Sequence, residues 1–341
     1  MKTQYFKIDP DHPDLNAIKK AVHYLHREEL VVFPTETVYG VGALVKSPAA
    51  VGRIFTAKER LPKSPLLVHI SRMEQALELV LTFPPAARRL AESYWPGPLS
   101  LILPARESVP EIVRGGSPTV GLRMPSHPVA RMLIDASGPL AATSANLSGR
   151  PSPVTADDVK ADLDGRVSAV LDAGPTGSGL ESTVLDLSGS DYCILRLGGV
   201  TVEEIEDLLE KKVKVVAQSQ AETDHYKIGI PVMTSKNEED FLILLHKLVD
   251  SGGRVGIVYN DCTKPSIIRE SIISSTVEYQ LNLKKTTLNL YSILRDAEKK
   301  QLDALIFAPL PKKEEGITAS YFDRIQAATT PYNPKLECPK N

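Results

Sequence analysis

Short strand-like apolar runs alternate with helix signals from about residue 17 to residue 212, and this alternation limits the fold more than any other feature of the chain. The loops between the runs are rich in proline and glycine. So many strands with intervening helices predict a mixed α/β domain around a large twisted sheet. The predicted strands are Leu30–Phe33, Leu66–Ile70, Leu99–Leu103, Val120–Arg123, Val167–Asp172, Ser182–Leu187 and Tyr192–Leu197.

Three helix starts in this part carry recognisable capping signals. Ser47-Pro48 has the form of an N-cap followed by a first-turn proline, and it predicts a helix running towards Lys58. The capping-box pattern occurs twice more, as Ser71…Glu74 and Thr201…Glu204. These signals predict three of the helices that separate the strands.

A polar stretch with little periodicity divides this region from the rest of the chain. We predict a first domain over residues 1–213, a linker over 214–229 and a second domain over 230–341. In the second domain, strands expected at Ile230–Met233, Val255–Tyr259 and Ala304–Phe307 alternate with helices. That pattern predicts a small, Rossmann-like parallel α/β domain, although the chain has neither G-x-G-x-x-G nor a Walker pattern.

Composition excludes several classes of protein. A formal charge of −2 argues against a globally polycationic nucleic-acid binder. No window reaches the roughly 18 uncharged apolar residues of a membrane span, and the N-terminus has no secretory h-region. The three cysteines are far apart and match neither a metal pattern nor a disulfide framework, so we expect a cytoplasmic protein without a metal site of its own.

One apolar stretch, LVVFPTETVYGVGAL, is interrupted by polar residues. After the strand-like run to Phe33, Pro34 is followed by Thr35, Glu36 and Thr37 before apolar and glycine residues resume. A surface hairpin explains the interruption. A pocket floor, where short hydroxyls meet a small ligand, explains it too, and the residues alone leave both interpretations open.

Four basic residues at the apparent ends of elements indicate an anion site. Lys58 and Arg60 alternate, so on an extended segment both would point the same way, and Arg123 and Arg196 end strand-like runs. Guanidinium groups suit carboxylate and phosphate oxygens. Short polar clusters lie nearby, at Thr143, Ser144 and Asn146 directly after an apolar strand and at Ser182 and Thr183. His69 interrupts a buried-looking strand, where a core histidine is the common explanation.

Six motifs in order resemble the YrdC-type threonylcarbamoyl-AMP synthases. They are FPTETVYGVGA, KERLPKSPLLVHI, WPGPLSLIL, VGLRMPSHP, ATSANLSGRPSP and GLESTVLDL…ILRLGG, and they span nearly all of residues 15–212. The second half, with LYSILRDAEKKQLDALIFAPLP, resembles more loosely the C-terminal domain of the longer, two-domain branch. The resemblance implies a YrdC-like mixed twisted sheet in the first domain.

The resemblance also implies a reaction. Enzymes of this family join L-threonine, bicarbonate and ATP into threonylcarbamoyl-AMP and release pyrophosphate, with Mg²⁺ expected to accompany the triphosphate. Partner proteins then transfer the threonylcarbamoyl group to an adenosine in tRNA. The resemblance implies no membrane partner and leaves direct contact with RNA open.

Site residues follow by matching positions to the family's motifs. The positions that match the L-threonine site are Thr35, His69, Arg123, Thr143 and Ser182. Those that match the ATP site are Lys58, Arg60, Ser64, Thr119, Ser144, Ala145, Asn146, Ser152, Arg196 and Tyr226. Lys58 and Arg60, the K-x-R signature, are the expected catalytic cations.

The chain departs from the family pattern at several positions. Glu59 stands where glycine is usual between the K-x-R cations, and Ser64 stands where asparagine is usual. The linker keeps His225-Tyr226 without the usual flanking residues. In the longer branch this segment is expected to close over the active site as a lid.

Two other functions remain as alternatives to the synthase. A carbamoyl-transfer domain of hydrogenase maturation shares the expected fold, but such proteins carry acylphosphatase and zinc-finger modules for which this chain has neither room nor cysteine spacing. A double-stranded RNA-binding module would use the same basic concavity, but the net charge and the motifs for a two-substrate pocket count against it.

Overall fold

The computed structural model describes residues 2–177, 179–216, 226, 228–259, 276–281, 290–309 and 316–329. The chain divides into two compact units, one of residues 1–148, 152–221 and 315–320, the other of residues 149–151, 222–314 and 321–341. None of the helices in the described ranges combines the length and apolar character that crossing a bilayer requires.

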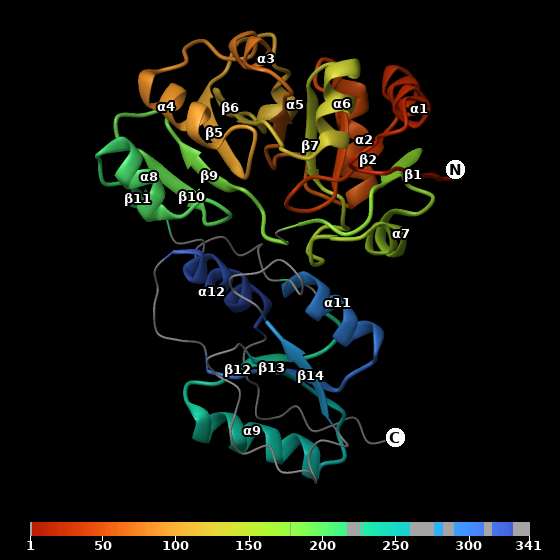
Figure 1. The fold of residues 1–341 in the computed structure, drawn as a ribbon, viewed down its shortest axis with the longest axis vertical. Coiled ribbons are helices and arrows are strands. Elements are labelled where there is room, and N and C mark those ends of the chain that lie inside the picture. The colour runs from red at the N-terminus through yellow and green to blue at the C-terminus, as the bar shows by residue number, and fades with distance from the viewer. Residues whose placement is uncertain are drawn as a thin grey trace. The chain divides into compact units, whose positions relative to one another are not determined.

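Strands and helices alternate in the first unit (Figure 1). Its strands are β1 (Gln4–Lys7), β2 (Val31–Phe33), β3 (Gly40–Leu44), β4 (Leu67–His69), β5 (Leu99–Pro104), β6 (Thr119–Arg123), β7 (Leu140–Ser144), β8 (Ala169–Asp172), β9 (Thr183–Asp186), β10 (Cys193–Arg196) and β11 (Lys214–Val215). Its helices are α1 (Leu15–His26), α2 (Pro48–Lys58), α3 (Met73–Leu77), α4 (Pro85–Tyr94), α5 (Glu111–Arg114), α6 (Pro128–Ser137), α7 (Ala156–Leu163) and α8 (Val202–Leu209).

These strands form one mixed sheet of eleven, in the order β1-β8-β2-β3-β7-β4-β6-β5-β9-β10-β11. All seven predicted strands are present within one or two residues of the expected bounds. The strands β1, β3 and β11 were not predicted. β7 was expected only as an apolar strand without bounds before Thr143, and it in fact includes Thr143 and Ser144. The sheet and its intervening helices confirm the predicted mixed α/β fold of this part of the chain.

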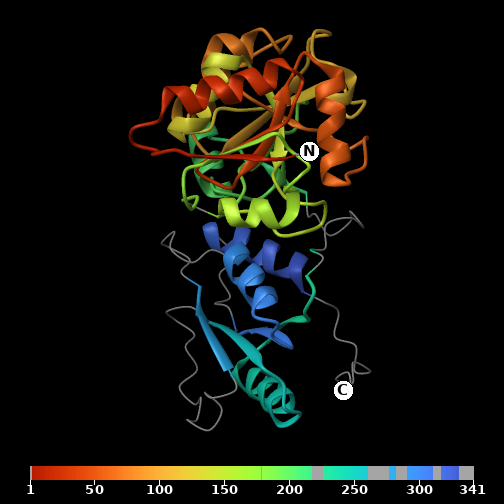
Figure 2. The same ribbon diagram turned by 90° about the vertical axis from the view of Figure 1, so that its right-hand side faces the viewer.

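Apolar residues cover both faces of the sheet beside β2, which explains why its sequence is a continuous apolar run. Val31 and Phe33 face α1 and α6, which pack against each other on one side (Figures 1 and 2). Val32 points to the opposite face and joins the larger core, to which α2, α4 and α7 contribute. Because successive strand residues alternate between faces, burial on both sides requires every position to be apolar.

The second unit contains a four-stranded parallel sheet in the order β12-β15-β13-β14. Its elements are β12 (Val232–Thr234), α9 (Glu238–Asp250), β13 (Val255–Tyr259), β14 (Thr276–Gln280), α11 (Leu290–Lys299) and β15 (Ala304–Phe307); α12 (Ile317–Ala328) is divided between the two units. Phe241 and Leu245 of α9 pack on one face of the sheet, and α11 lies on the other side (Figure 2). The parallel sheet confirms the α/β pattern read from the sequence, while β14 was not predicted.

Two of the three capping signals mark helix starts as predicted. Ser47 caps α2 by accepting a hydrogen bond from the Ala50 backbone N–H, and Thr201 and Glu204 form a full capping box on α8. The prediction for Ser71 was wrong. The N-cap of α3 is Arg72, which makes no side-chain capping bond, while Ser71 binds the side chain of Gln75 instead.

Glu59, which replaces the family's usual glycine, lies in the left-handed region. It is the C-cap of α2 with φ +53°, a conformation that costs residues with a Cβ about 1–2 kcal/mol. Its carboxylate contacts Arg166 at 2.7 Å, but both side chains are largely exposed, so the ion pair contributes little.

Glu59→Gly should therefore raise the free energy of unfolding by about 0.5–1 kcal/mol, since glycine adopts this conformation without strain. Urea unfolding of wild type and variant measures the difference. Glu59→Ala is the matched control, because it removes the ion pair but keeps the strain, and it should not stabilise. If Glu59→Gly were no more stable than Glu59→Ala, the left-handed conformation at residue 59 would not be a source of backbone strain.

Candidate functional site

A row of cross-strand neighbours on one face of the large sheet forms the base of the site. His69 of β4 lies opposite Arg123 of β6, Arg123 opposite Ser100 of β5, and Val184 of β9 lies between Ser100 and Arg196 of β10. Directly paired residues project from the same face of a sheet. The sheet pairing thus brings His69, Arg123 and Arg196 to one face from distant parts of the sequence.

The helices α1 and α6 cover this same face only over part of the sheet. The strand residues of their apolar cluster come from β8, β2 and β7, with Leu44 of β3 packed against it. In β4, β6 and β5 the opposite face carries the apolar residues, including Val68, Leu122 and Leu101. The polar row therefore begins where the apolar cluster under α1 and α6 ends.

A cavity of about 170 Å³ lies at this place. Seven of the predicted substrate positions line it, namely Thr35, Arg60, His69, Arg123, Thr143, Ser144 and Arg196. The other lining residues are Val38, Gly40, Pro65, Leu66, Leu67, Ala142 and Glu181. Hydroxyls and three guanidinium groups converge here, which suits a ligand with several anionic oxygens.

The connection between β2 and β3 supplies one wall of the cavity. The strands pair antiparallel, so the polar interruption after Phe33 is a hairpin connection. The buried Thr35 hydroxyl donates to the Val38 carbonyl at 2.6 Å and accepts from the backbone N–H groups of Thr37 and Val38. Thr35 therefore closes the turn and also lines the cavity: the interruption is a hairpin, but a buried one and not the surface hairpin that the sequence allowed.

Arg123 is buried and held by the same connection. Its Nη2 donates to Glu36 Oε1 at 2.7 Å and to Thr37 Oγ1 at 2.9 Å, and the second oxygen of Glu36 accepts from the Ser126 backbone. Its Nε is buried without a hydrogen-bond partner among the described residues. Glu36 was not among the predicted site residues; its position inside the polar interruption was the available signal.

His69 is a neutral residue in this site. Burial lowers its pKa to about 3, and the nearby positive charge of Arg123 acts in the same direction. Its ring contacts Phe33 edge to face at 5.9 Å, and its Nδ1 is buried without a partner in the described ranges. At neutral pH the ring is therefore a hydrogen-bonding group rather than a cation.

Ser182 lies beneath the cavity and not among its lining residues. It is fully buried, and its hydroxyl contacts Ser100 Oγ at 2.7 Å and accepts from Arg196 Nη2 at 2.9 Å. Arg196 also donates from Nε to the Ser182 carbonyl. Ser182 and Ser100 thus hold Arg196 at the edge of the cavity, and Ser100 was missed because it is a single polar residue in an apolar strand.

Lys58 and Arg60 do not lie on an extended segment, which was the condition for expecting both side chains to point the same way. Lys58 is the last residue of α2, not part of an extended segment, and its Nζ is buried. It donates to the backbone carbonyls of Ser144 and Asn146, the latter at 2.5 Å, whereas Arg60 lines the cavity. The left-handed C-cap at Glu59 ends the helix between the two residues.

The remaining predicted positions lie outside the cavity lining. Ser152 is buried and donates to Glu181 Oε1 at 2.7 Å, Thr119 Oγ1 pairs with Ser117 Oγ at 2.7 Å, and Ser64 donates its backbone N–H to Leu61. Ala145 and Asn146 follow β7. Tyr226, described within the second unit, meets Tyr291 through their hydroxyls at 2.8 Å. His225 and most of the predicted lid lie outside the described residues.

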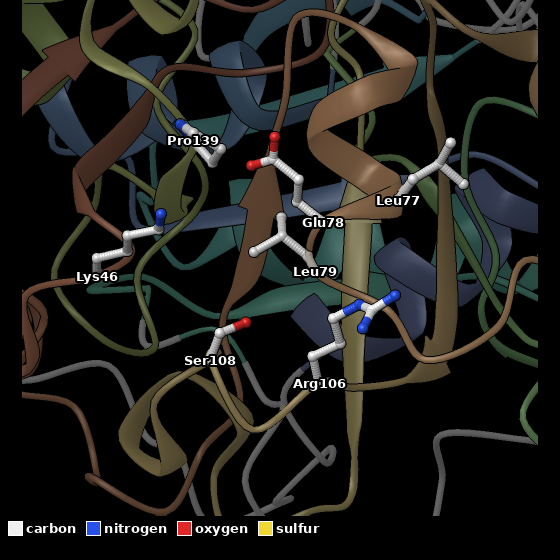
Figure 3. Close-up of a pocket in the computed structure, with 7 residues that line it drawn as sticks. All are labelled: Lys46, Leu77, Glu78, Leu79, Arg106, Ser108 and Pro139. Atoms are coloured by element: carbon white, nitrogen blue, oxygen red, sulfur yellow. The ribbon is translucent and has the colours of Figure 1, made fainter.

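A larger cavity, of about 510 Å³, lies at the other ends of β3 and β7 and contains none of the predicted positions. Figure 3 shows its lining, which has Lys46, Glu78 and Arg106 around Leu79. These charged side chains are exposed and of both signs. Their mixed charge does not match the anionic groups that the sequence led us to expect.

Comparisons with known proteins match nearly the whole chain. Residues 23–198 match the family model Sua5_yciO_yrdC, described as Telomere recombination, and residues 200–330 match the model described as Threonylcarbamoyl-AMP synthase, C-terminal domain. The chain is 36% identical to the threonylcarbamoyl-AMP synthase of Bacillus subtilis over 96% of this chain and 98% of the relative. It is 34% identical to that of Pyrococcus abyssi over 92% and 94%. The crystal structure of P. abyssi Sua5 complexed with L-threonine superposes with a TM-score of 0.85 at 32% identity, covering 96% of this chain and 98% of that one.

The depressed pKa of His69 predicts a specific loss of stability in acid. As the pH falls below the ordinary histidine pKa of about 6.5, the unfolded chain takes up a proton that the folded protein refuses until about pH 3. The contribution of His69 to the free energy of unfolding is therefore fully present above pH 6.5. It falls as the pH drops below that value, by about 2 kcal/mol at pH 5. The free energy of unfolding of His69→Gln should not show this fall.

Urea unfolding of wild type and His69→Gln at pH 7 and pH 5 tests the prediction. The quantity compared is the change in the free energy of unfolding between pH 7 and pH 5, so a destabilisation by the substitution that is the same at both pH values cancels. His127, whose pKa is also lowered by burial, contributes equally in both proteins. An equal loss of stability in wild type and variant would show that the pKa of His69 is not lowered in the folded protein.

Proposed function

Because this chain belongs to the threonylcarbamoyl-AMP synthase family, we propose that the cavity beside Arg123 is where its substrates are joined. The chain is a nucleotidyltransferase that makes L-threonylcarbamoyladenylate and pyrophosphate from L-threonine, bicarbonate and ATP. The product serves the threonylcarbamoyl modification of adenosine in tRNA. One observation supports the location above all: the hydroxyls of Thr35, Thr143 and Ser144 meet three guanidinium groups in one cavity.

The chemistry explains why the site needs cations and hydrogen-bond donors rather than a nucleophilic side chain. The threonine amine and bicarbonate give a carbamate, and a carbamate oxygen then attacks the α-phosphorus of ATP as pyrophosphate leaves. The substrates supply the nucleophile. The protein must bring anionic groups together and stabilise the charge that develops on the phosphoryl oxygens, for which fixed guanidinium groups are suited.

The amino-acid end of the cavity is assigned to the buried residues of the first unit. Arg123, fixed by Glu36 and Thr37, would present its remaining N–H groups to the threonine carboxylate. Thr35, Thr143 and the neutral ring of His69 would contact the substrate hydroxyl and methyl. Ser182 would act from beneath, through Arg196.

The ATP end is assigned to Arg60, Ser144 and Arg196, which line the cavity, and to the loop after β7. Lys58 would fix this loop through the carbonyls of Ser144 and Asn146, while Arg60 would act by direct charge. Ser64, Thr119, Ala145, Ser152 and Tyr226 complete the proposed ATP contacts. ATP would enter as its magnesium complex, since phosphate oxygens are ligands that Mg²⁺ prefers.

Three parts of the proposal concern the setting of the enzyme. We place it in the cytoplasm, in keeping with its three widely separated cysteines, whose spacing matches no disulfide framework. Its product would pass to proteins that transfer the threonylcarbamoyl group to tRNA. The linker before the second unit would act as a lid, because an adenylate that hydrolyses readily must be kept from water.

The direct test is pyrophosphate release from ATP with each co-substrate omitted in turn. Release should require both L-threonine and bicarbonate. Replacing threonine by 2-aminobutyrate, which lacks the hydroxyl, should lower kcat/KM at least tenfold, because buried polar groups of the site would lose their partner. Pyrophosphate release that is independent of threonine would refute the proposal.

Lys58 and Arg60 should differ in their contributions. Arg60→Gln should lower turnover at least tenfold, because a fixed positive charge at the cavity is lost, and it should destabilise the protein less than Lys58→Met does, because Arg60 is only half-buried. Lys58→Met should lower turnover and also cost about 1–3 kcal/mol of stability, because two carbonyls lose a buried donor. Turnover and urea unfolding measure both effects.

Arg53, an exposed arginine on the same helix as Lys58, provides the control. Arg53→Gln should leave turnover and stability unchanged. Equal stability of the Lys58→Met and Arg60→Gln proteins would show that Lys58 does not hold the loop.

A further inference from the structure

Gly40 of β3 lies in the lining of the 170 Å³ cavity and has no side chain to place there. Glycine weakens a strand, so its presence needs a physical reason. The backbone does not supply one. Gly40 pairs in register with Phe33 of β2 and Ser144 of β7, and its φ lies outside the left-handed region, so other residues could adopt this conformation.

The neighbouring protein atoms in the described ranges do not require a glycine either. A Cβ at Gly40 would lie 3.4 Å from Cζ of Phe33 and 3.6 Å from the Thr143 carbonyl oxygen, which are ordinary van der Waals separations. Gly42, two residues further along β3, is different, because its Cβ would lie only 2.9 Å from Cε1 of Phe33. Packing against Phe33 thus explains Gly42, whereas the described protein atoms leave room for a methyl group at Gly40.

A side chain at residue 40 would project from the face of the sheet that carries the site. Gly40 and Leu44 lie on the same face of β3, since they are an even number of residues apart. Leu44 pairs directly with Leu140 of β7, and Leu140 pairs directly with His69 of β4. Directly paired residues share a face. A methyl group at residue 40 would therefore take up space in the cavity itself.

Its neighbours place Gly40 at the amino-acid end of the site. The Phe33 ring, which lies over Gly40, contacts the ring of His69 edge to face at 5.9 Å. His69 and Thr143 are both proposed contacts of the threonine side chain. Val38 adds another apolar side chain to the same lining. The space over Gly40 is therefore bounded by apolar groups, and it suits a small apolar substituent.

The γ-methyl group of L-threonine is the one methyl group that the three substrates carry. We propose that Gly40 selects the amino acid by size, because the space over its Cα holds this methyl group. Glycine allows such a close approach of a ligand to the backbone. A side-chain methyl group at residue 40 would compete with the substrate methyl group for the same space. This inference rests on the proposed function and adds a specificity-determining residue to it.

Exchanging one methyl group for another tests the proposal. Gly40→Ala adds a methyl group to the protein, whereas L-serine lacks the methyl group of L-threonine. In pyrophosphate release, Gly40→Ala should lower kcat/KM for threonine at least tenfold, because overfilling a packed site displaces the substrate or the protein. For serine kcat/KM should change less than threefold, and so should KM for ATP. The preference for threonine over serine should fall accordingly.

Gly52 of α2 provides the matched control. A Cβ there would lie 3.8 Å from Cδ1 of Ile112, an ordinary separation, and Gly52 is not among the described residues that line the cavity. Gly52→Ala adds the same methyl group and should leave kcat/KM for both amino acids unchanged. Urea unfolding checks the fold: neither variant should unfold at a lower urea concentration than wild type, because alanine fits both sites and restricts the unfolded chain.

Three results would overturn the proposal. Equal losses of kcat/KM with threonine and serine would show a general disturbance of the site. No loss with either amino acid would show that the substrate does not fill the space over Gly40. A raised KM for ATP with an unchanged preference would place the nucleotide in that space instead of the methyl group.

The wild type supplies a second test that does not depend on the folding of a variant. The threonine analogue β-hydroxynorvaline carries an ethyl group in place of the methyl group, and its kcat/KM should be at least tenfold below that of threonine. Equal values would show that the space over Gly40 does not limit size. A wild type that releases no pyrophosphate with threonine would refute the proposed function itself, whereas an active wild type whose preference survives in Gly40→Ala would refute only the role of Gly40.

Discussion

Burial of the large sheet on both of its faces limits where polar groups can lie. One face is covered by apolar side chains from β2 to β10, whereas the cluster under α1 and α6 on the other face takes its strand residues from β8, β2 and β7. The polar row of His69, Arg123, Ser100 and Arg196 lies on the rest of that second face. The site therefore occupies the part of the sheet that these two helices leave uncovered.

The order of the strands makes this row possible. β4, β6, β5, β9 and β10 are neighbours in the sheet, although their residues are spread from Leu67 to Arg196 along the chain. Direct pairing fixes the register, and a shift by one residue would turn each polar side chain to the apolar face. Packing on the apolar face thus stabilises the alignment of the polar groups on the other.

The residues that hold the site are as important as those that line it. Glu36 and Thr37 keep Arg123 in place, Lys58 ties down the backbone after β7, and Ser100 and Ser182 support Arg196. The family resemblance assigned Lys58 to ATP, and the alternation of lysine and arginine around Glu59 predicted a common direction for both side chains on an extended segment. The structure places a helix end there, so the segment is not extended. Local spacing predicts direction only when the local conformation is known.

The resemblance to the family named seven of the fourteen residues that line the cavity. The sequence by itself determined the α/β class, the seven strands with predicted bounds and the parallel α/β pattern of the second unit. Those features depend on side-chain period and on local signals such as proline, glycine and caps, which neighbouring residues settle. Tertiary structure alone decided that Thr35 closes a hairpin and lines a pocket at once, that Ser71 is not a cap, and that Glu36, Ser100 and Glu181 belong to the site. The physical reason is that pairing between strands far apart in the chain sets which side chains meet, and no local pattern records that pairing.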